Sequence, residues 1–210
     1  MKKQAKHPKT DYFLEIFDLA ERKYGKSSKR LAGEGWKEHW QTLISTIMSA
    51  QTRDEVTIPI AEALFAKYPT LEKLSKAKQS DVLKIIRSLN YSPTKAKHII
   101  LAAKYLKDNH DGKVPCSIEE LILIPGVGRK TANLVITECH AMDGICVDTH
   151  VHRISNVLGI VNTKTPYETE LELMKVAPKE YWSKINRIFV LWGKETPGND
   201  AEKLLSRIKQ

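Results

Sequence analysis

Cysteine is scarce in this sequence of 210 residues, which contains only Cys116, Cys139 and Cys146. The number is odd and no C-x-x-C spacing occurs, so the sequence supports neither a disulfide framework nor a zinc ribbon, and we expect reduced, mostly buried thiols. Long apolar runs are missing as well. The stretch 58–65 is interrupted by a proline and a glutamate and is far shorter than the ~20 residues of a membrane helix. We therefore expect no membrane partner.

Glycine and proline are also few, with 10 and 9 residues, which excludes a low-complexity polymer. Apolar residues make up 41% of the chain and charged residues 28%, as in ordinary globular proteins. The basic segment 1–11 is not followed by the apolar core of a secretion signal. These features predict a folded, soluble, cytoplasmic protein whose residues 1–9 form a basic, flexible tail.

Acidic residues are outnumbered, with 25 Asp and Glu against 34 Lys and Arg. The resulting charge of +9 and pI of about 9.3 favour a polyanionic partner such as nucleic acid. Charge alone does not say which polyanion is bound. It does add nucleoid association to the expected cytoplasmic location.

Strand signals are nearly absent, and about ten helices joined by short links predict an all-α protein. The expected helix starts are marked by proline or by residues that cap helix N-termini. These starts are Pro59, Thr70, Ser80, Ser92, Ser117, Asp148, Thr165 and Ala177. We interpret the apolar stretch 145–147 as a buried connector, because no partner strand is evident.

The most informative motif is Pro-Gly-Val-Gly at 125–128, placed between two expected helices. Gly126 and Gly128 permit positive φ and carry no Cβ to hold a ligand away. Backbone N–H groups at the start of the next helix can then point at a phosphate oxygen, independently of base sequence. The alternative is an ordinary tight turn. Arg129, Lys130 and the basic charge favour DNA.

Lys130 and Asp148 could share a cleft, since each begins a helix and 18 residues separate them. A lysine with a pKa near ~10.4 is almost always protonated at neutral pH, so nucleophilic use requires desolvation or a cationic neighbour such as Arg129. Asp148 would stay ionised as a helix cap and could accept a proton. Taken singly, a solvated lysine and a simple cap are the more ordinary interpretations.

Three segments together resemble the endonuclease III family of helix-hairpin-helix DNA glycosylases: 123–133, 49–51 and 147–153. The similarity runs from about Trp40 to Leu191. It implies a helix-hairpin-helix DNA glycosylase fold with two helical subdomains and a DNA-binding cleft between them. The expected central domain spans residues 38–150. The second helical subdomain is expected to combine residues 10–37 with residues 151–210.

The resemblance also implies a reaction and a set of site residues. Lys130 corresponds to the family's Schiff-base lysine and Asp148 to its essential aspartate, for cleavage of the N-glycosidic bond followed by strand nicking. Gln51 would enter the duplex and Tyr91 would act as a stacking wedge, although Tyr91 could instead pack on the core. His150 either contacts phosphate or packs. The expected hairpin contacts to DNA are Gly126, Val127, Gly128, Arg129 and Thr131.

The sequence departs from this family at its C-terminal end. The usual member holds an iron–sulfur cluster with four C-terminal cysteines, whereas no cysteine follows Cys146 here. We therefore expect no cluster, no protein-bound metal site and no other cofactor, while a monovalent cation at the hairpin stays open. Apolar packing would then hold the C-terminal element, through Trp182, Trp192, Leu204 and Leu205.

Three functions stay open at this stage. The first is a bifunctional glycosylase and AP lyase that removes an oxidised pyrimidine from duplex DNA containing damaged bases or abasic sites. The second is a glycosylase for uracil or thymine mismatches, or for another modified base, on the same scaffold. The third is a non-catalytic helix-hairpin-helix module that binds bent or damaged DNA. In each case we expect a monomer.

Overall fold

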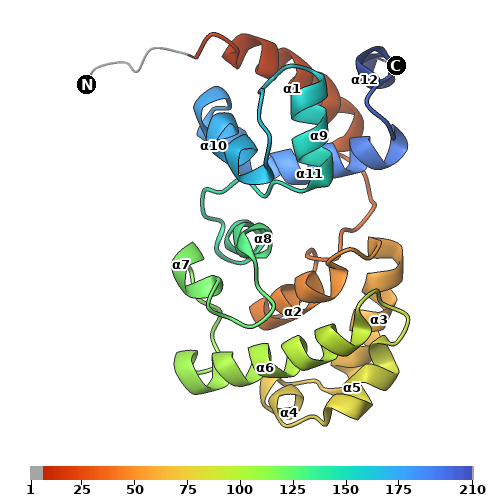
Figure 1. Cartoon of the computed structure of the whole chain (residues 1–210), viewed down its shortest axis with the longest axis vertical. Coiled ribbons are helices and arrows are strands. Elements are labelled where there is room, and N and C mark those ends of the chain that lie inside the picture. The colour runs from red at the N-terminus through yellow and green to blue at the C-terminus, as the bar shows by residue number, and fades with distance from the viewer. Residues whose placement is uncertain (1–6, 210) are drawn as a thin grey trace, which may run out of the picture. The chain divides into compact units, whose positions relative to one another are not determined.

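The computed structural model describes residues 7–209 and contains no strand among them, which confirms the all-α class. Within this described part, no helix is long and apolar enough to cross a membrane. Residues 1–6 of the expected basic tail lie outside the described residues. Contacts divide the chain into two compact units, 30–142 and 1–29 with 143–210 (Figure 1). Each boundary lies earlier in the chain than the expected limits at 38 and 150.

The unit formed by residues 30–142, here the central unit, is built from seven helices around one apolar core. Helix α6 packs against α2, α4 and α5, and α2 also contacts α3 and α8 (Figure 1). The helices are α2 (His39–Ser49), α3 (Asp54–Lys67), α4 (Leu71–Ser75), α5 (Gln79–Ile86), α6 (Ser92–His110), α7 (Ile118–Leu121) and α8 (Arg129–His140).

Two of the expected caps in the central unit are confirmed by their hydrogen bonds. The Thr70 hydroxyl accepts from the backbone N–H of Lys73 at 3.2 Å, and the Ser117 hydroxyl accepts from the N–H of Glu120 at 3.2 Å. Ser117 also donates to the Glu120 carboxylate at 2.8 Å, which strengthens the start of α7. These side chains satisfy N–H groups that have no partner within the helix.

Three expected starts are wrong. Ala177 is the C-cap of α10 (Pro166–Val176), and the next α-helix, α11 (Trp182–Glu195), begins only after a 3₁₀ turn. Helix α3 begins at Asp54 and carries Pro59 in its interior. Acidic residues in its first turn suit the positive end of the helix dipole, and this signal outweighs the usual preference of proline for a helix start. Helix α5 is preceded by Lys78, which makes no side-chain cap, and it already includes Ser80. Val82 and Ile86 of this helix are fully buried, and their packing stabilises it without a side-chain cap.

The other unit, here the terminal unit, combines the first helix with the last ones. Its elements are α1 (Thr10–Tyr24), α9 (Thr149–Val157), α10 (Pro166–Val176), the 3₁₀ turn Lys179–Tyr181, α11 (Trp182–Glu195) and α12 (Ala201–Lys209). Helix α11 contacts α1 and α9. Phe17 packs between Phe13 and Phe189, with ring centroids 5.5 and 6.3 Å away, and this aromatic core joins the two ends of the sequence.

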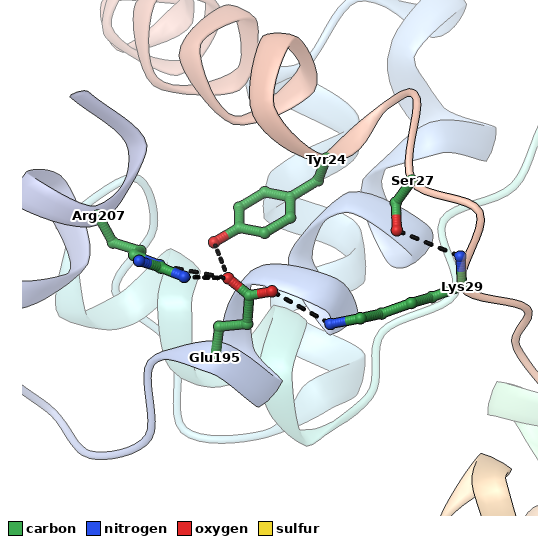
Figure 2. A network of polar contacts seen from close by, with 5 residues as sticks. All are labelled: Tyr24, Ser27, Lys29, Glu195 and Arg207. Atoms are coloured by element: carbon green, nitrogen blue, oxygen red, sulfur yellow. Dashed lines mark hydrogen bonds and ion pairs between the residues drawn. The ribbon is translucent and has the colours of Figure 1, made fainter. Parts of the chain in front are cut away.

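Helix α12 is held by apolar contacts and by a polar cluster that the sequence did not reveal. Leu204 is fully buried, as expected, while Leu205 is half-buried. The Glu195 carboxylate accepts hydrogen bonds from the Tyr24 hydroxyl at 3.2 Å, from Arg207 at 2.7 Å and from Lys29 at 3.2 Å (Figure 2). Burial, followed by the nearby Glu195 charge, raises the pKa of Tyr24 to about 12. We call these four residues the Glu195 cluster.

Candidate active site

The hairpin between α7 and α8 is a tight turn that needs only one of its two glycines for its backbone conformation. Gly126 has φ +85°, and an added Cβ would lie 2.8 Å from Cβ of His98. Gly128 has φ −98° and ψ 175°, so it does not use the positive φ that glycine permits. Nothing lies within 4 Å of a Cβ built on Gly128. Its missing side chain therefore leaves open space in front of α8 instead of relieving strain.

This difference predicts that alanine substitutions at the two glycines have different effects on stability. Gly126→Ala should lower the free energy of unfolding by about 1–3 kcal/mol, because the new methyl group meets His98 and the backbone is left-handed. Gly128→Ala should leave stability within about 0.5 kcal/mol or raise it slightly. Urea denaturation of both variants measures the difference. Equal destabilisation by the two substitutions would contradict the conclusion that only Gly126 is required for the backbone of the hairpin.

The residues around the start of α8 divide into exposed and buried side chains. Arg129 and Lys130 are exposed, whereas Val127 and Thr131 are buried. The backbone N–H of Val127 donates to the carbonyl of Ile124 at 3.0 Å, so Val127 shapes the hairpin from within. The N–H groups in the first turn of an α-helix have no acceptor within that helix, and helix starts of this kind commonly bind anions.

Asp148 is the N-cap of α9 and belongs to the terminal unit. One carboxylate oxygen, Oδ1, accepts from the backbone N–H groups of His150 and Val151, both at 2.9 Å. The preceding residues 145–147 are buried without forming a strand, which confirms the expected connector. Asn186 of α11 donates to the carbonyl of Cys146 at 2.9 Å and fixes this connector. The carboxylate is thus rigidly placed and still half-exposed.

His150 packs inside the terminal unit. A Cβ added to Gly193 of α11 would lie 2.3 Å from Nδ1 and 2.9 Å from Cβ of His150, so the imidazole rests directly on this glycine. Of the two interpretations left open by the sequence, the structure shows the packing contact. A contact of His150 with phosphate stays a prediction.

Gln51 and Tyr91 both adopt left-handed backbone conformations, with φ of 53° and 57°. Such conformations cost free energy in residues other than glycine and persist only where the surroundings impose them. Gln51 is exposed, and Tyr91 is 65% exposed, so Tyr91 does not pack on the core. Both side chains therefore point outward. The two turns are adjacent, because the Asn90 amide donates to the carbonyl of Gln51 at 2.5 Å.

Lys95, in the first turn of α6, is a residue that the sequence interpretation missed. It is 5% exposed, and its Nζ donates to the carbonyl of Met48 at 2.6 Å and to the Thr52 hydroxyl at 2.9 Å. Burial lowers its pKa from 10.5 to about 8. Its spacing in the sequence could have indicated this burial, because Lys95 lies one helical turn before Ile99 and on the same face as the apolar residues of this helix.

The lowered pKa of Lys95 predicts a pH dependence of stability. Between about pH 8 and 10.5 the folded amine is neutral while the unfolded amine is still protonated. The unfolded state then binds more protons, so stability rises with pH across this window, by at most about 1.4 kcal/mol per pH unit. As the pH falls, this gain is lost between about 10.5 and 8, and below 8 Lys95 no longer makes stability depend on pH. Urea unfolding of the wild type and of Lys95→Met checks this, since only the difference between them reports Lys95. A difference that stays constant from pH 7 to 10 would contradict it.

The residues of this chain do not fit the iron–sulfur cluster of the family. Four cysteine ligands are the usual requirement, and the chain has three, of which Cys116 is exposed and Cys146 buried. Burial also raises the pKa of Cys139 to about 11, which disfavours the thiolate that a metal needs. Among residues 7–209, no group of three or more His, Cys, Asp or Glu side chains could hold a metal ion.

The fold and the hairpin agree with the comparisons to known proteins. Residues 44–179 match the model of the HhH-GPD superfamily of base excision DNA repair proteins, and the chain belongs to this family. Endonuclease III of Thermotoga maritima is 44% identical over 155 residues, which cover 74% of this chain and 73% of the relative. Endonuclease III of Synechocystis is 36% identical over 155 residues, covering 73% and 71% of the two chains.

Solved structures give the same result. The chain is similar to a trapped endonuclease III–DNA covalent intermediate, with 30% identity, a TM-score of 0.83 and coverage of 90% of this chain and 88% of the other. It is also similar to a non-covalent endonuclease III–DNA complex, with 26% identity, a TM-score of 0.84 and coverage of 97% and 100%. The helix-hairpin-helix DNA glycosylase fold expected from the sequence is confirmed.

Proposed function

We propose that this protein is a DNA N-glycosylase with AP lyase activity that removes a damaged base from duplex DNA and then nicks the strand. The observation that carries the proposal is the exposed amine of Lys130 at the start of α8, directly after the glycine hairpin. It occurs in a chain that is 30% identical to an endonuclease III trapped covalently on DNA.

Lys130 and Asp148 divide the chemistry between them in this proposal. The neutral Lys130 amine attacks C1′ of the deoxyribose, the N-glycosidic bond breaks, and the base leaves with the bonding electron pair. Asp148 stabilises the positive charge that develops on the sugar and accepts the proton released by the attacking amine. The C1′–O4′ bond then breaks, O4′ takes up the proton held by Asp148, and a protonated imine forms between Lys130 and C1′. Loss of a C2′ proton then expels the 3′ phosphate by β-elimination.

The exposure of Lys130 bears on when the amine can react. In the absence of DNA the side chain is exposed, so burial within the protein alone does not desolvate it. We propose that the bound DNA covers Lys130 and supplies this desolvation. The amine would then become an efficient nucleophile only when substrate is in place.

The substrate we propose is an oxidised pyrimidine in duplex DNA, extruded from the helix before excision. Extrusion costs least at damaged or mispaired bases, and Gln51 and Tyr91 would fill the gap left in the duplex. A panel of duplexes that carry oxidised pyrimidines, uracil, mismatched thymine or an abasic site separates the candidates when base release and nicking are measured independently. Preferential release of uracil or thymine would instead support a glycosylase for uracil or thymine mismatches.

Borohydride trapping tests the proposed reaction itself. Incubation of the protein with a labelled abasic duplex and sodium borohydride should give a covalent protein–DNA adduct. Binding to the same duplex with no adduct and no nick would overturn the enzymatic proposal and support a binding module.

DNA affinity should fall steeply as the salt concentration rises, because the proposed contacts of the hairpin are to backbone phosphates. Raising the salt from about 50 to about 200 mM should weaken binding by at least on the order of 10-fold, since a few released counterions already have this effect. Fluorescence anisotropy on an undamaged duplex measures the slope. A flat response would argue against an interface dominated by phosphate contacts.

The same proposal includes the working state of the protein. We propose that it acts as a monomer, without a cofactor, on the DNA of the nucleoid. The net charge of +9 supports association with a polyanion. Sedimentation of the protein with and without a short abasic duplex would test the stoichiometry.

A further inference from the structure

The turns that carry Gln51 and Tyr91 are joined to each other by a small set of polar contacts. The Asn90 amide donates to the carbonyl of Gln51 at 2.5 Å, and the backbone N–H of Asn90 donates to the Thr52 hydroxyl at 3.2 Å. These bonds connect two segments that are separated by 39 residues in the sequence. We therefore expect a change in one turn to affect the other.

Lys95 lies beneath both turns and contacts each of them. Its backbone N–H donates to the carbonyl of Tyr91 at 3.0 Å, while its Nζ donates to the Thr52 hydroxyl at 2.9 Å and to the carbonyl of Met48 at 2.6 Å. Met48 lies in the last turn of α2, whose free carbonyls favour a cation. One side chain thus ties the end of α2 and the turn after it to the start of α6.

The burial of Lys95 indicates that these polar contacts matter. The side chain is 5% exposed, whereas the residues it supports, Gln51, Asn90 and Tyr91, are all exposed. A methionine would fill the same space without the cost of removing an ammonium group from water. The start of a helix is moreover an unfavourable place for a positive charge. Packing alone therefore does not explain a lysine at this position.

We propose that Lys95 is a positioning residue that holds the left-handed turns of Gln51 and Tyr91 in place, so that both side chains enter the duplex when the target nucleotide is extruded. This inference rests on the proposed function of the chain as a glycosylase and lyase. Lys95 does not contact DNA in this role. It acts through the turns, and its loss should affect extrusion more than binding or covalent chemistry.

Comparison of duplex and single-stranded abasic DNA tests the proposal, because only the duplex requires strand separation. The test variant is Lys95→Met, and the matched control is Lys104→Met, which removes an exposed lysine from the same helix. Lys95→Met should lower the single-turnover rate of borohydride trapping on the duplex by at least about 10-fold. The rate on single-stranded DNA and the Kd for undamaged duplex should change by less than about 3-fold, and Lys104→Met should match the wild type on both abasic substrates.

Two milder variants keep the test valid if Lys95→Met does not fold. Thr52→Val removes the acceptor shared by Lys95 and Asn90, and Asn90→Ala removes only the exposed amide that reaches Gln51. Both should show the same selective loss on duplex. A 2-aminopurine base next to the abasic site should also gain less fluorescence on binding than with the wild type, because its stacking is less disturbed.

The outcomes separate this inference from the proposed function. Equal losses on duplex and single-stranded DNA, or no loss on either, would overturn the positioning role alone. A wild-type protein that forms no adduct with either substrate would overturn the proposed function, and this inference with it.

Discussion

Replacement of Lys130 by glutamine is expected to abolish the borohydride-trapped adduct and to lower strand nicking by at least about 10³-fold. The glutamine amide is similar in length but cannot form an imine with C1′, so neither the covalent intermediate nor β-elimination remains. Lys130 is exposed, and the fold should therefore be unaffected. Denaturing electrophoresis of a labelled abasic duplex separates the adduct, the nicked strand and the intact strand in one measurement.

The control for this experiment is Lys104→Gln, which removes an exposed positive charge elsewhere in the central unit. It should trap abasic DNA as the wild type does, while both variants keep the wild-type unfolding midpoint. A Lys130→Gln protein that still forms the adduct would assign the nucleophile to another amine.

Replacement of Asp148 by asparagine should lower the single-turnover rate of base release by about 10²–10⁴-fold while leaving the protein folded. Asparagine caps a helix about as well as aspartate, because its side-chain oxygen can also accept from the N–H groups of His150 and Val151. It carries no negative charge and cannot take up the proton from the attacking amine. Loss of the charge at the N-terminus of α9 should cost less than about 1 kcal/mol of stability.

Asp148→Ala provides the comparison that separates chemistry from capping. It should show the same catalytic loss together with a further decrease of about 1 kcal/mol in the free energy of unfolding, because the cap is gone. Thermal denaturation and the rate of base release are measured on both variants. If Asp148→Asn released the base within a few-fold of the wild-type rate, the carboxylate would be a structural cap only.

The features that could be predicted from the sequence are those set by local physics. Thr70, Ser117 and Asp148 cap helices because their side-chain oxygens reach N–H groups a few residues away. Two glycines between helices indicate the hairpin, and an apolar run without a partner strand indicates the buried connector 145–147. Each of these signals lies within a few residues of the feature that it predicts.

The features that were missed depend on contacts between distant segments. Pro59 indicates a helix start by itself, yet α3 begins at Asp54, whose carboxylate is held by the distant backbone N–H of Ala32. Lys95 is an ordinary basic residue until Met48 and Thr52 are placed against it by the fold. Propensity carries no information about such partners, because they lie more than 20 residues away in the sequence.

The Glu195 cluster has a consequence for biosynthesis. Its members come from opposite ends of the chain, with Tyr24 and Lys29 on one side and Arg207 on the other. While the protein emerges from the ribosome, the central unit has all of its helices once residue 142 has been made, whereas α1 must wait for α11 and α12. The hairpin that would hold DNA is therefore complete earlier in translation than the unit that carries Asp148, and a nascent chain stalled before α11 would present Lys130 without a finished terminal unit.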